Sequence, residues 1–180
     1  VASIQLAKAL GASMVIAGVI GEGNEAIASQ AGADHVIDLG EDNLRDSLRE
    51  HIQTITNGHG VDVVIDPVGG DANTAALRAM AWCGRMVIIG FASGTIPTIK
   101  ANYLLVKNIA VTGLQWSDYR DHVPERVIEV QNNLFALYLK GSIDPYISKR
   151  VPLDGFAEAL ALLRDGKAQG KIIIEVRPLK

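Results

Sequence analysis

Short β-branched apolar segments alternate with helix-forming segments along most of the chain, and this alternation restricts the possible folds more than any other feature. The apolar segments are nearly continuous, which is typical of strands buried on both faces of a parallel sheet. The sequence therefore predicts an α/β fold with a doubly wound parallel sheet. Its strands are expected at Met14–Val19, His35–Asp38, Val61–Asp66, Met86–Phe91 and Ile109–Gln115.

Helical patterns separate these strands. One apolar stripe predicts a helix that begins near Asp42 and ends before Gly58, with Leu44, Leu48, Ile52 and Ile55 on the buried face. A second helix is expected over residues 73–81, and a third begins at Pro124. The third helix places apolar residues at Val127, Ile128, Leu134, Phe135 and Tyr138.

Composition excludes several classes of protein. The 180 residues are 48% hydrophobic and 21% charged, which suits one sizeable domain or one domain with a terminal extension. A net charge of −3 gives no basic surface for nucleic acid or an anionic membrane. No apolar run is long enough to span a bilayer, so we expect a cytoplasmic protein. Cys83 is the only cysteine and shares no ligand spacing with the histidines, so no metal site is expected.

One domain boundary is expected, at Lys140–Gly141. It separates a first domain over residues 1–140 from a C-terminal segment over residues 141–180, which would complete another domain. In that segment we expect strands at Tyr146–Ser148 and Lys171–Val176. Between them lies a predicted helix that is capped by Asp154 and turns Phe156, Leu160 and Leu163 inward.

The chain starts with VASIQLAK, a pattern typical of the middle of an amphipathic helix. In nucleotide-binding α/β proteins, a strand and a G-x-G-x-x-G turn precede such a helix and bring backbone N–H groups to a pyrophosphate. We therefore expect the sheet to lack its usual first, central strand and that turn. The chain would then be the C-terminal part of a larger enzyme, and would be inactive alone.

Three of the expected strands end in glycine-rich or polar loops. Ligands of open parallel sheets bind outside the carboxyl ends of the strands, and glycine lets the backbone approach them closely. Loops between strands and helices often contain glycine without binding anything, but three such loops at one edge favour a ligand site. The loops are GVIGEGN (Gly18–Asn24), DPVGGD (Asp66–Asp71) and GFASG (Gly90–Gly94).

Six segments follow one another in a characteristic order and spacing: IQLAKALGA (4–12), AGADHVID (31–38), GVDVVIDPVGGD (60–71), GRMVIIGFASGTIP (84–97), LLVKNIAVTG (104–113) and a final VPL…EAL…GKAQGKIII. Together they resemble the zinc-independent quinone oxidoreductases of the medium-chain dehydrogenase/reductase superfamily, over essentially the whole chain. The resemblance implies a Rossmann-type dinucleotide-binding domain over residues 1–140. It further implies an NAD(P)H-dependent enzyme that transfers hydride to a quinone or an α,β-unsaturated carbonyl, without a metal.

The resemblance also implies which residues contact the cofactor, mostly through the backbone. The loop after the fourth strand would hold the nicotinamide carboxamide, the loop after the third strand would border the adenosine side, and the fifth strand would end near the nicotinamide. No catalytic side chain is expected. Ser93 is equally well explained as an ordinary turn residue, and the Asp66 carboxylate is better explained as the cap of a turn. The implied residues are Gly90, Phe91, Ala92 and Ser93, then Asp66, Pro67, Val68 and Gly69, and last Gly113, Leu114 and Gln115.

Choice between the two cofactors should depend on the loop after the first strand. NAD-preferring relatives carry an acidic residue at that strand end, where it binds the ribose 2′-hydroxyl. This chain has Gly18 and Val19 there, which favours NADP(H) over NAD(H). Against this preference, Asn24 stands where relatives usually offer a lysine to the 2′-phosphate, and Glu22 is nearby. Leu39 replaces an aromatic residue that often follows the next strand.

The resemblance implies a homodimer formed by the edge strand Ile109–Gln115 and the neighbouring Trp116. Three other functions remain open. One is an enoyl-thioester reductase of the same superfamily. Another is a Rossmann-like methyltransferase, because VDVVIDPV followed by GRMVIIGF mimics strands of that class. The last is a non-catalytic protein that keeps the fold for binding.

Overall fold

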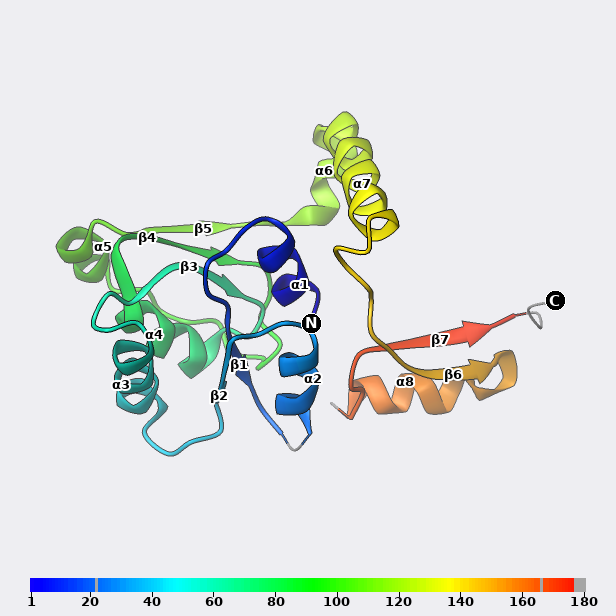
Figure 1. The fold of residues 1–180 in the computed structure, drawn as a ribbon, viewed down its shortest axis with the longest axis horizontal. Helices are drawn as coiled ribbons and strands as arrows, with labels where there is room; N and C mark the ends of the chain where they lie inside the picture. The colour runs from blue at the N-terminus through cyan, green and yellow to red at the C-terminus, as the bar shows by residue number, and fades with distance from the viewer. Residues whose placement is uncertain (22, 166, 177–180) are drawn as a thin grey trace. The chain divides into compact units, whose positions relative to one another are not determined.

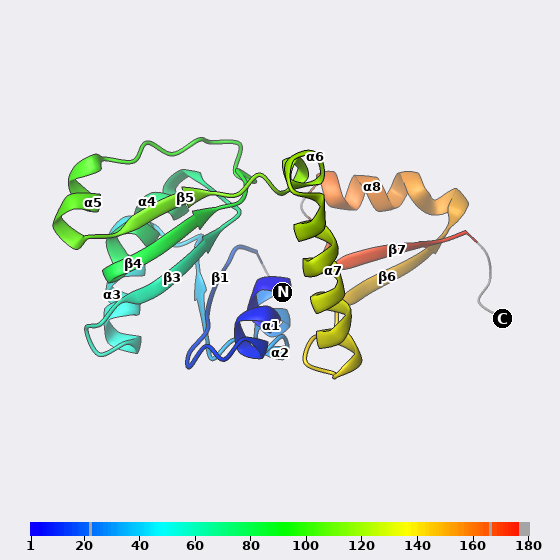
Figure 2. The ribbon, with the colours of Figure 1, turned by 90° about the horizontal axis from the view of Figure 1, so that it is seen from above.

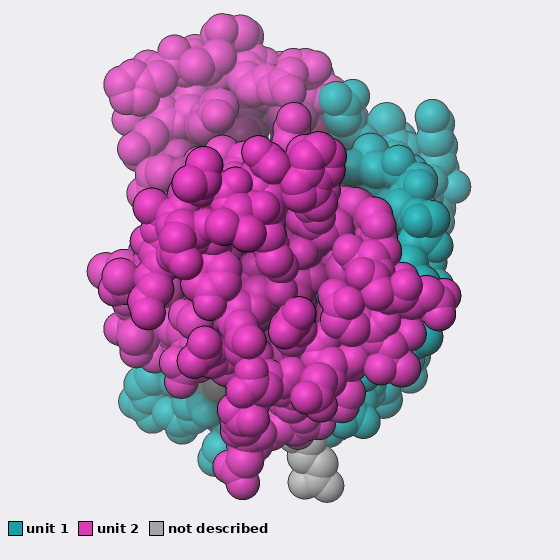
Figure 3. All heavy atoms as spheres, turned by 90° about the vertical axis from the view of Figure 1, so that its left-hand side faces the viewer, with its two compact units in different colours: residues 1–17, 22–36, 133–180 teal, residues 18–21, 37–132 magenta. Residues whose placement is uncertain are grey.

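The structure is a computed structural model, and it describes residues 1–21, 23–165 and 167–176. The chain divides into two compact units, coloured separately in Figure 3. Unit 1 contains Val1–Ala17, Glu22–Val36 and Asn133–Lys180, and unit 2 contains Gly18–Gly21 and Ile37–Asn132. Both units are discontinuous in sequence, and the domain boundary expected at Lys140–Gly141 stays a prediction.

Unit 2 is built on a three-stranded parallel sheet, with strand order β3 (Val61–Asp66), β4 (Met80–Ile88) and β5 (Ala110–Gly113) (Figures 1 and 2). Asp66 pairs with Ile88, and Ile88 pairs with Gly113. The carboxyl ends of the three strands are therefore level, so the loops that follow them leave the sheet at the same edge.

Helices α3 (Leu44–Ile55) and α4 (Gly70–Ala79) pack against each other in unit 2. Leu48 and Ile52 are buried, which confirms the stripe predicted for α3. The core under the sheet consists of Leu77, Met80, Met86 and Ile109. The unit is completed by α5 (Ala101–Lys107), by a 3-10 turn η1 (Trp116–Asp118), by α6 (Tyr119–His122) and by the start of α7 (Pro124–Leu139).

Lys107, at the end of α5, closes the C-terminus of α4. Its Nζ donates hydrogen bonds to the carbonyl oxygens of Arg78 at 2.6 Å and Met80 at 2.9 Å. A helix end leaves such carbonyls without intrahelical partners, so a cation is favourable there. Burial is the main cause that lowers the pKa of Lys107, and the nearby positive charges of Arg49 and Arg78 lower it further. Lys107 therefore has a structural role.

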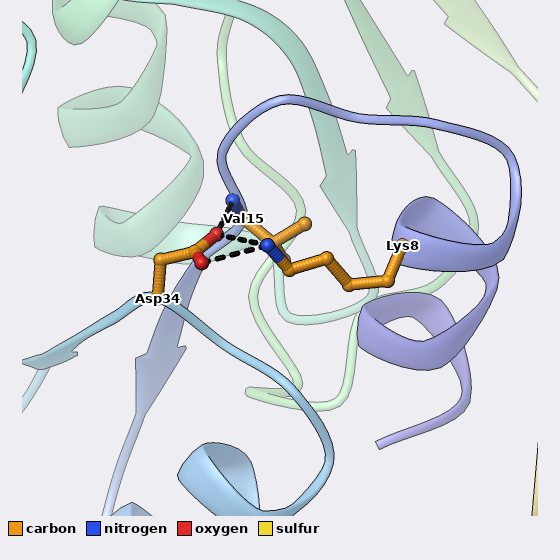
Figure 4. A network of polar contacts seen from close by, with 3 residues as sticks. All are labelled: Lys8, Val15 and Asp34. Carbon is orange, nitrogen blue, oxygen red and sulfur yellow. Dashed lines mark hydrogen bonds and ion pairs between the residues drawn. The ribbon is translucent and has the colours of Figure 1, made fainter.

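Unit 1 contains α1 (Ala2–Ala9), α2 (Asn24–Gln30) and a parallel pair of strands, β6 (Ile147–Pro152) and β7 (Lys171–Glu175). The turn η2 (Leu153–Gly155) and α8 (Phe156–Arg164) connect the two strands. Figure 4 shows how Asp34 joins α1 to the chain before the first strand. The Asp34 carboxylate accepts hydrogen bonds from Lys8 Nζ at 2.5 and 2.7 Å and from Val15 N–H at 2.6 Å.

Two short strands, β1 (Ile16–Val19) and β2 (His35–Asp38), form a separate two-stranded sheet. Asp34 N–H donates to Val15 O at 2.8 Å, and Leu39 N–H donates to Val19 O at 2.7 Å. From the first of these bonds to the second, the residue number increases along both strands, so the two strands are parallel. The described strands thus form separate sheets of two, three and two strands, and the expected lack of a central strand stays a prediction.

The predicted α/β class with parallel strands is confirmed. The strand expected at Met86–Phe91 runs instead from Met80 to Ile88, because its last residues turn away to bond the neighbouring loop. The expected orientation of α8 is wrong: Phe156, Leu160 and Leu163 are about half exposed, and Ala159 is the buried residue. Asp154 lies in η2 and its side chain does not cap α8, which begins after Gly155. None of the described helices is both long and apolar enough to cross a membrane.

Candidate functional site

The loops that follow β3 and β4 are joined by four backbone hydrogen bonds. Ile89 N–H donates to Asp66 O at 2.9 Å, Ala92 N–H to Pro67 O at 3.0 Å, and Ser93 N–H to Val68 O at 3.0 Å. In return, Gly70 N–H donates to Thr95 O at 3.0 Å. These bonds extend the β3–β4 pairing beyond the sheet, so the two loops form one structural element at its carboxyl edge.

Glycine allows these loops to approach so closely. Gly69 has φ +73° and ψ −155°, a conformation that side chains other than glycine rarely adopt. A Cβ atom at Gly69 would lie 2.8 Å from Thr95 O and 2.9 Å from Phe91 Cδ1. At Gly90, a Cβ atom would lie 3.3 Å from Pro67 O. Contact between the loops therefore requires glycine at position 69 and leaves little room for a side chain at position 90, in addition to any contact with a ligand.

The Asp66 side chain holds the first loop from inside. Its carboxylate is buried, and Oδ1 accepts hydrogen bonds from the N–H groups of Val68 and Gly69, both at 2.9 Å. Oδ2 accepts a third bond, from Asn73 Nδ2, at 2.6 Å. The carboxylate thus caps the turn, one of the two roles considered for it, and any contact of Asp66 with a ligand would come from its backbone.

The end of β5 joins the same edge. Leu114 N–H donates to Ile88 O at 3.0 Å, which keeps Gly113, Leu114 and Gln115 beside the end of β4. A Cβ atom at Gly113 would meet no atom within 4 Å, so space is open there. The structure therefore brings together the predicted residues of three loops, namely Asp66–Gly69, Gly90–Ser93 and Gly113–Gln115.

Only part of the backbone of the second loop is free to bind a ligand. The N–H groups of Ala92 and Ser93 are already used by the first loop. Those of Gly90 and Phe91 make no hydrogen bond with the described residues. Ser93 Oγ accepts a bond from Thr95 N–H at 3.2 Å, as expected for a turn serine. The N–H groups of Gly90 and Phe91 are therefore the donors of this loop that remain available to a ligand.

The residues expected to govern cofactor choice lie at the end of β1 and beyond it. Gly18 and Val19 belong to unit 2, where a Cβ atom at Gly18 would lie 2.9 Å from Leu39 Cδ1. Asn24 is the first residue of α2 and belongs to unit 1. Glu22, in the same loop, lies outside the described residues. No carboxylate ends β1, as the sequence indicated.

Two residues of this site were missed at the level of sequence. Thr95 accepts the Gly70 hydrogen bond, and Asn73 holds the Asp66 carboxylate. Asn73 precedes Leu77 by about one turn on the same face of α4, and this polar residue on an apolar face was a usable signal. Within the described residues, no three His, Cys, Asp or Glu side chains are grouped as a metal site would need.

A family model described as "Zinc-binding dehydrogenase" matches residues 1–132. The chain is 36% identical over 152 residues to a quinone oxidoreductase-like protein 2 homolog of Nematostella vectensis, covering 84% of this chain and 40% of that protein. It is 32% identical over 174 residues to quinone oxidoreductase 1 of Escherichia coli K12, covering 94% and 51%.

Among solved structures, a mycobacterial protein complexed with NADPH has a TM-score of 0.83 and 26% sequence identity. The match covers 95% of this chain and 52% of that one. The chain thus spans about half the length of each of these three proteins.

Proposed function

The chain belongs to the zinc-binding dehydrogenase family of oxidoreductases, and on this basis we propose that it binds the nicotinamide cofactor of an NAD(P)H-dependent enzyme. The complete enzyme would transfer hydride to a quinone or an α,β-unsaturated carbonyl. Membership of the family sets the methyltransferase interpretation aside. The joined loops after β3 and β4 carry the proposal, because they present backbone donors at the carboxyl edge of a parallel sheet.

The described residues fit a nicotinamide. The free N–H groups of Gly90 and Phe91 are adjacent donors, and the open space at Gly113 leaves room beside them for a flat ring. When bound, the reduced nicotinamide supplies the hydride, so the protein contributes orientation rather than a reacting side chain. Gly90 and Phe91 would hold the carboxamide and fix which ring face meets the substrate, while Gly113 would leave the ring uncrowded.

The described residues do not fit zinc, although the family name includes it, because they offer no group of three ligand side chains. We propose NADPH rather than NADH as the cofactor, because Gly18 and Val19 carry no carboxylate that would repel a 2′-phosphate. The mycobacterial neighbour complexed with NADPH supports this preference.

We also propose a homodimer through Ile109–Gln115. β5 is an edge strand of its three-stranded sheet, so it pairs with a described strand on one side only. Leu114 N–H points to Ile88 O on β4. In a parallel pair, alternate residues point the same way, so Val111 and Gly113 turn their backbone groups away from β4. These groups are the ones that a second copy would pair with.

Equilibrium titration tests the cofactor proposal. NADPH should quench the intrinsic fluorescence of the protein in a saturable way, whereas S-adenosylmethionine should not. Oxidation of NADPH should then depend on added quinone when the complete enzyme is assayed. Binding without any oxidation by quinones or enones would favour a non-catalytic binding protein, and failure to bind either nicotinamide cofactor would refute the proposal.

A further inference from the structure

Two polar side chains, Asp66 and Asn73, are buried within unit 2 just beneath the candidate site. Asp66 is 5% exposed and Asn73 is 1% exposed. No described cation forms a salt bridge with the Asp66 carboxylate, which is held instead by two backbone N–H groups and the Asn73 amide. Burying a carboxylate is unfavourable unless its oxygens are hydrogen-bonded, so removal of one donor has a large effect here.

The Asn73 amide is itself held from the core. Asn73 Nδ2 lies 2.6 Å from Asp66 Oδ2 and 3.2 Å from Met86 Sδ. Met86 belongs to β4 and is fully buried. An amide nitrogen has two hydrogens, so both are directed at these partners. Asn73 therefore links the end of β3, the first turn of α4 and the middle of β4 at a single point.

Hydrogen bonds connect this point to both loops. Asp66 Oδ1 holds the peptide groups of Val68 and Gly69, and Pro67 O and Val68 O in turn hold Ala92 and Ser93. A shift of the carboxylate would pass through the first loop to the second, where the free N–H groups of Gly90 and Phe91 lie. No ligand needs to touch Asn73 for this to happen.

We propose that Asn73 is a positioning residue for the cofactor: through Asp66 and Met86 it sets where the two loops present their backbone donors. The proposal rests on the proposed function, since it concerns binding of the nicotinamide cofactor. Asn73→Ala leaves Asp66 Oδ2 buried without its side-chain donor. We expect the Kd for NADPH to rise by as much as about tenfold, which corresponds to the full loss of one hydrogen bond to a charged group.

Asn73→Asp gives a readout that a general loss of packing would not give. Two carboxyl groups in contact share a proton, so one of them titrates at a raised pKa. The hydrogen-bond partners on every side of the pair, which are Met86 and the peptide groups of Val68 and Gly69, do not titrate. Below that raised pKa, the introduced acid can donate to Asp66, and affinity for NADPH should approach that of the unaltered protein. Above it, the two charges repel and affinity should fall.

The control is Leu48→Ala, at a buried position in α3, a helix that packs against α4 and contributes no residue to the two loops. It should lower the melting temperature and leave the Kd for NADPH unchanged, provided that the Kd is measured well below the melting transition of the variant. An Asn73→Ala protein with unchanged Kd, or an Asn73→Asp protein whose Kd has the same pH dependence as the unaltered protein, would overturn the inference alone. An unaltered protein that binds no NADPH would overturn the proposed function and this inference with it.

Discussion

Replacing Gly69 by alanine tests the close approach of the two loops directly. Gly69 has a positive φ with an extended ψ, and a Cβ atom there would lie 2.8 Å from Thr95 O and 2.9 Å from Phe91 Cδ1. Thr95 O is a backbone atom that accepts a bond from Gly70, so it cannot move away without breaking one of the four bonds that join the loops. The substitution therefore adds backbone strain and a steric clash at the same point.

Gly94 provides the matched control. It also has a positive φ, +77°, but a Cβ atom there would meet no atom within 4 Å. Alanine at Gly94 should therefore cost only the left-handed backbone penalty, about 1 kcal/mol. At Gly69 the backbone penalty and the clash should together cost about 3 kcal/mol. For a chain of this size, that corresponds to a decrease in melting temperature of about 6–12 °C, against about 2–4 °C for Gly94→Ala.

Thermal unfolding and NADPH titration of both variants provide the assay. Gly69→Ala should separate the loops and weaken NADPH binding, whereas Gly94→Ala should leave binding close to that of the unaltered protein. Equal decreases in melting temperature for the two variants would show that the loops do not require this contact. A stable Gly69→Ala protein with unchanged affinity would refute the reasoning entirely.

Three further predictions follow from other parts of the molecule. The hydrogen bond from Lys8 is the main reason why the pKa of Asp34 is below its usual range. Asp34 therefore stabilises the fold at pH values above its unfolded-state pKa of about 3.9, and this stabilisation is lost as the pH falls through its lower folded-state pKa. Urea unfolding of Asp34→Asn should accordingly show a smaller loss of stability on acidification than the unaltered protein. Val19→Asp should shift kcat/KM of the complete enzyme from NADPH toward NADH by repelling the 2′-phosphate, and an unchanged ratio would count against that role. Gly113→Pro removes an N–H group that points away from β4, so sedimentation should show a shift from dimer to monomer; a dimer that survives the change does not use this edge.

The sequence predicted the parallel strands well, because their apolar, β-branched segments are explicit. β2 and β3 begin and end where they were expected. The helices α2 and α5 were not predicted, since each has only seven residues and too short a pattern to show a helical period. The orientation of α8 failed for another reason. Periodicity finds an apolar face on a helix, but it does not say whether that face is covered.

The sequence predicted which loops form the candidate site, but it did not predict the contacts between them. Glycines after β3 and β4 indicated close backbone approach, but the sequence does not show that the partner of Gly69 is the neighbouring loop. The N–H groups of Ala92 and Ser93 are already used, whereas those of Gly90 and Phe91 are not. This difference depends on hydrogen bonds between residues about 25 positions apart, which the sequence does not show. The buried partner of Asp66 could have been found from Asn73 on the apolar face of α4.

A site made of backbone donors has a particular consequence for how it can change. Substitution can remove a side chain that contacts a ligand, but it leaves a peptide N–H in place, because every residue except proline has one. Affinity then depends on where the loops lie, and that is determined by Gly69, by the buried Asp66 carboxylate and by the Asn73 amide. Exposed residues of the loops, such as Ala92, should tolerate substitution with little loss of cofactor binding. Conversely, the most damaging substitutions should lie beneath the loops, at residues that no cofactor touches.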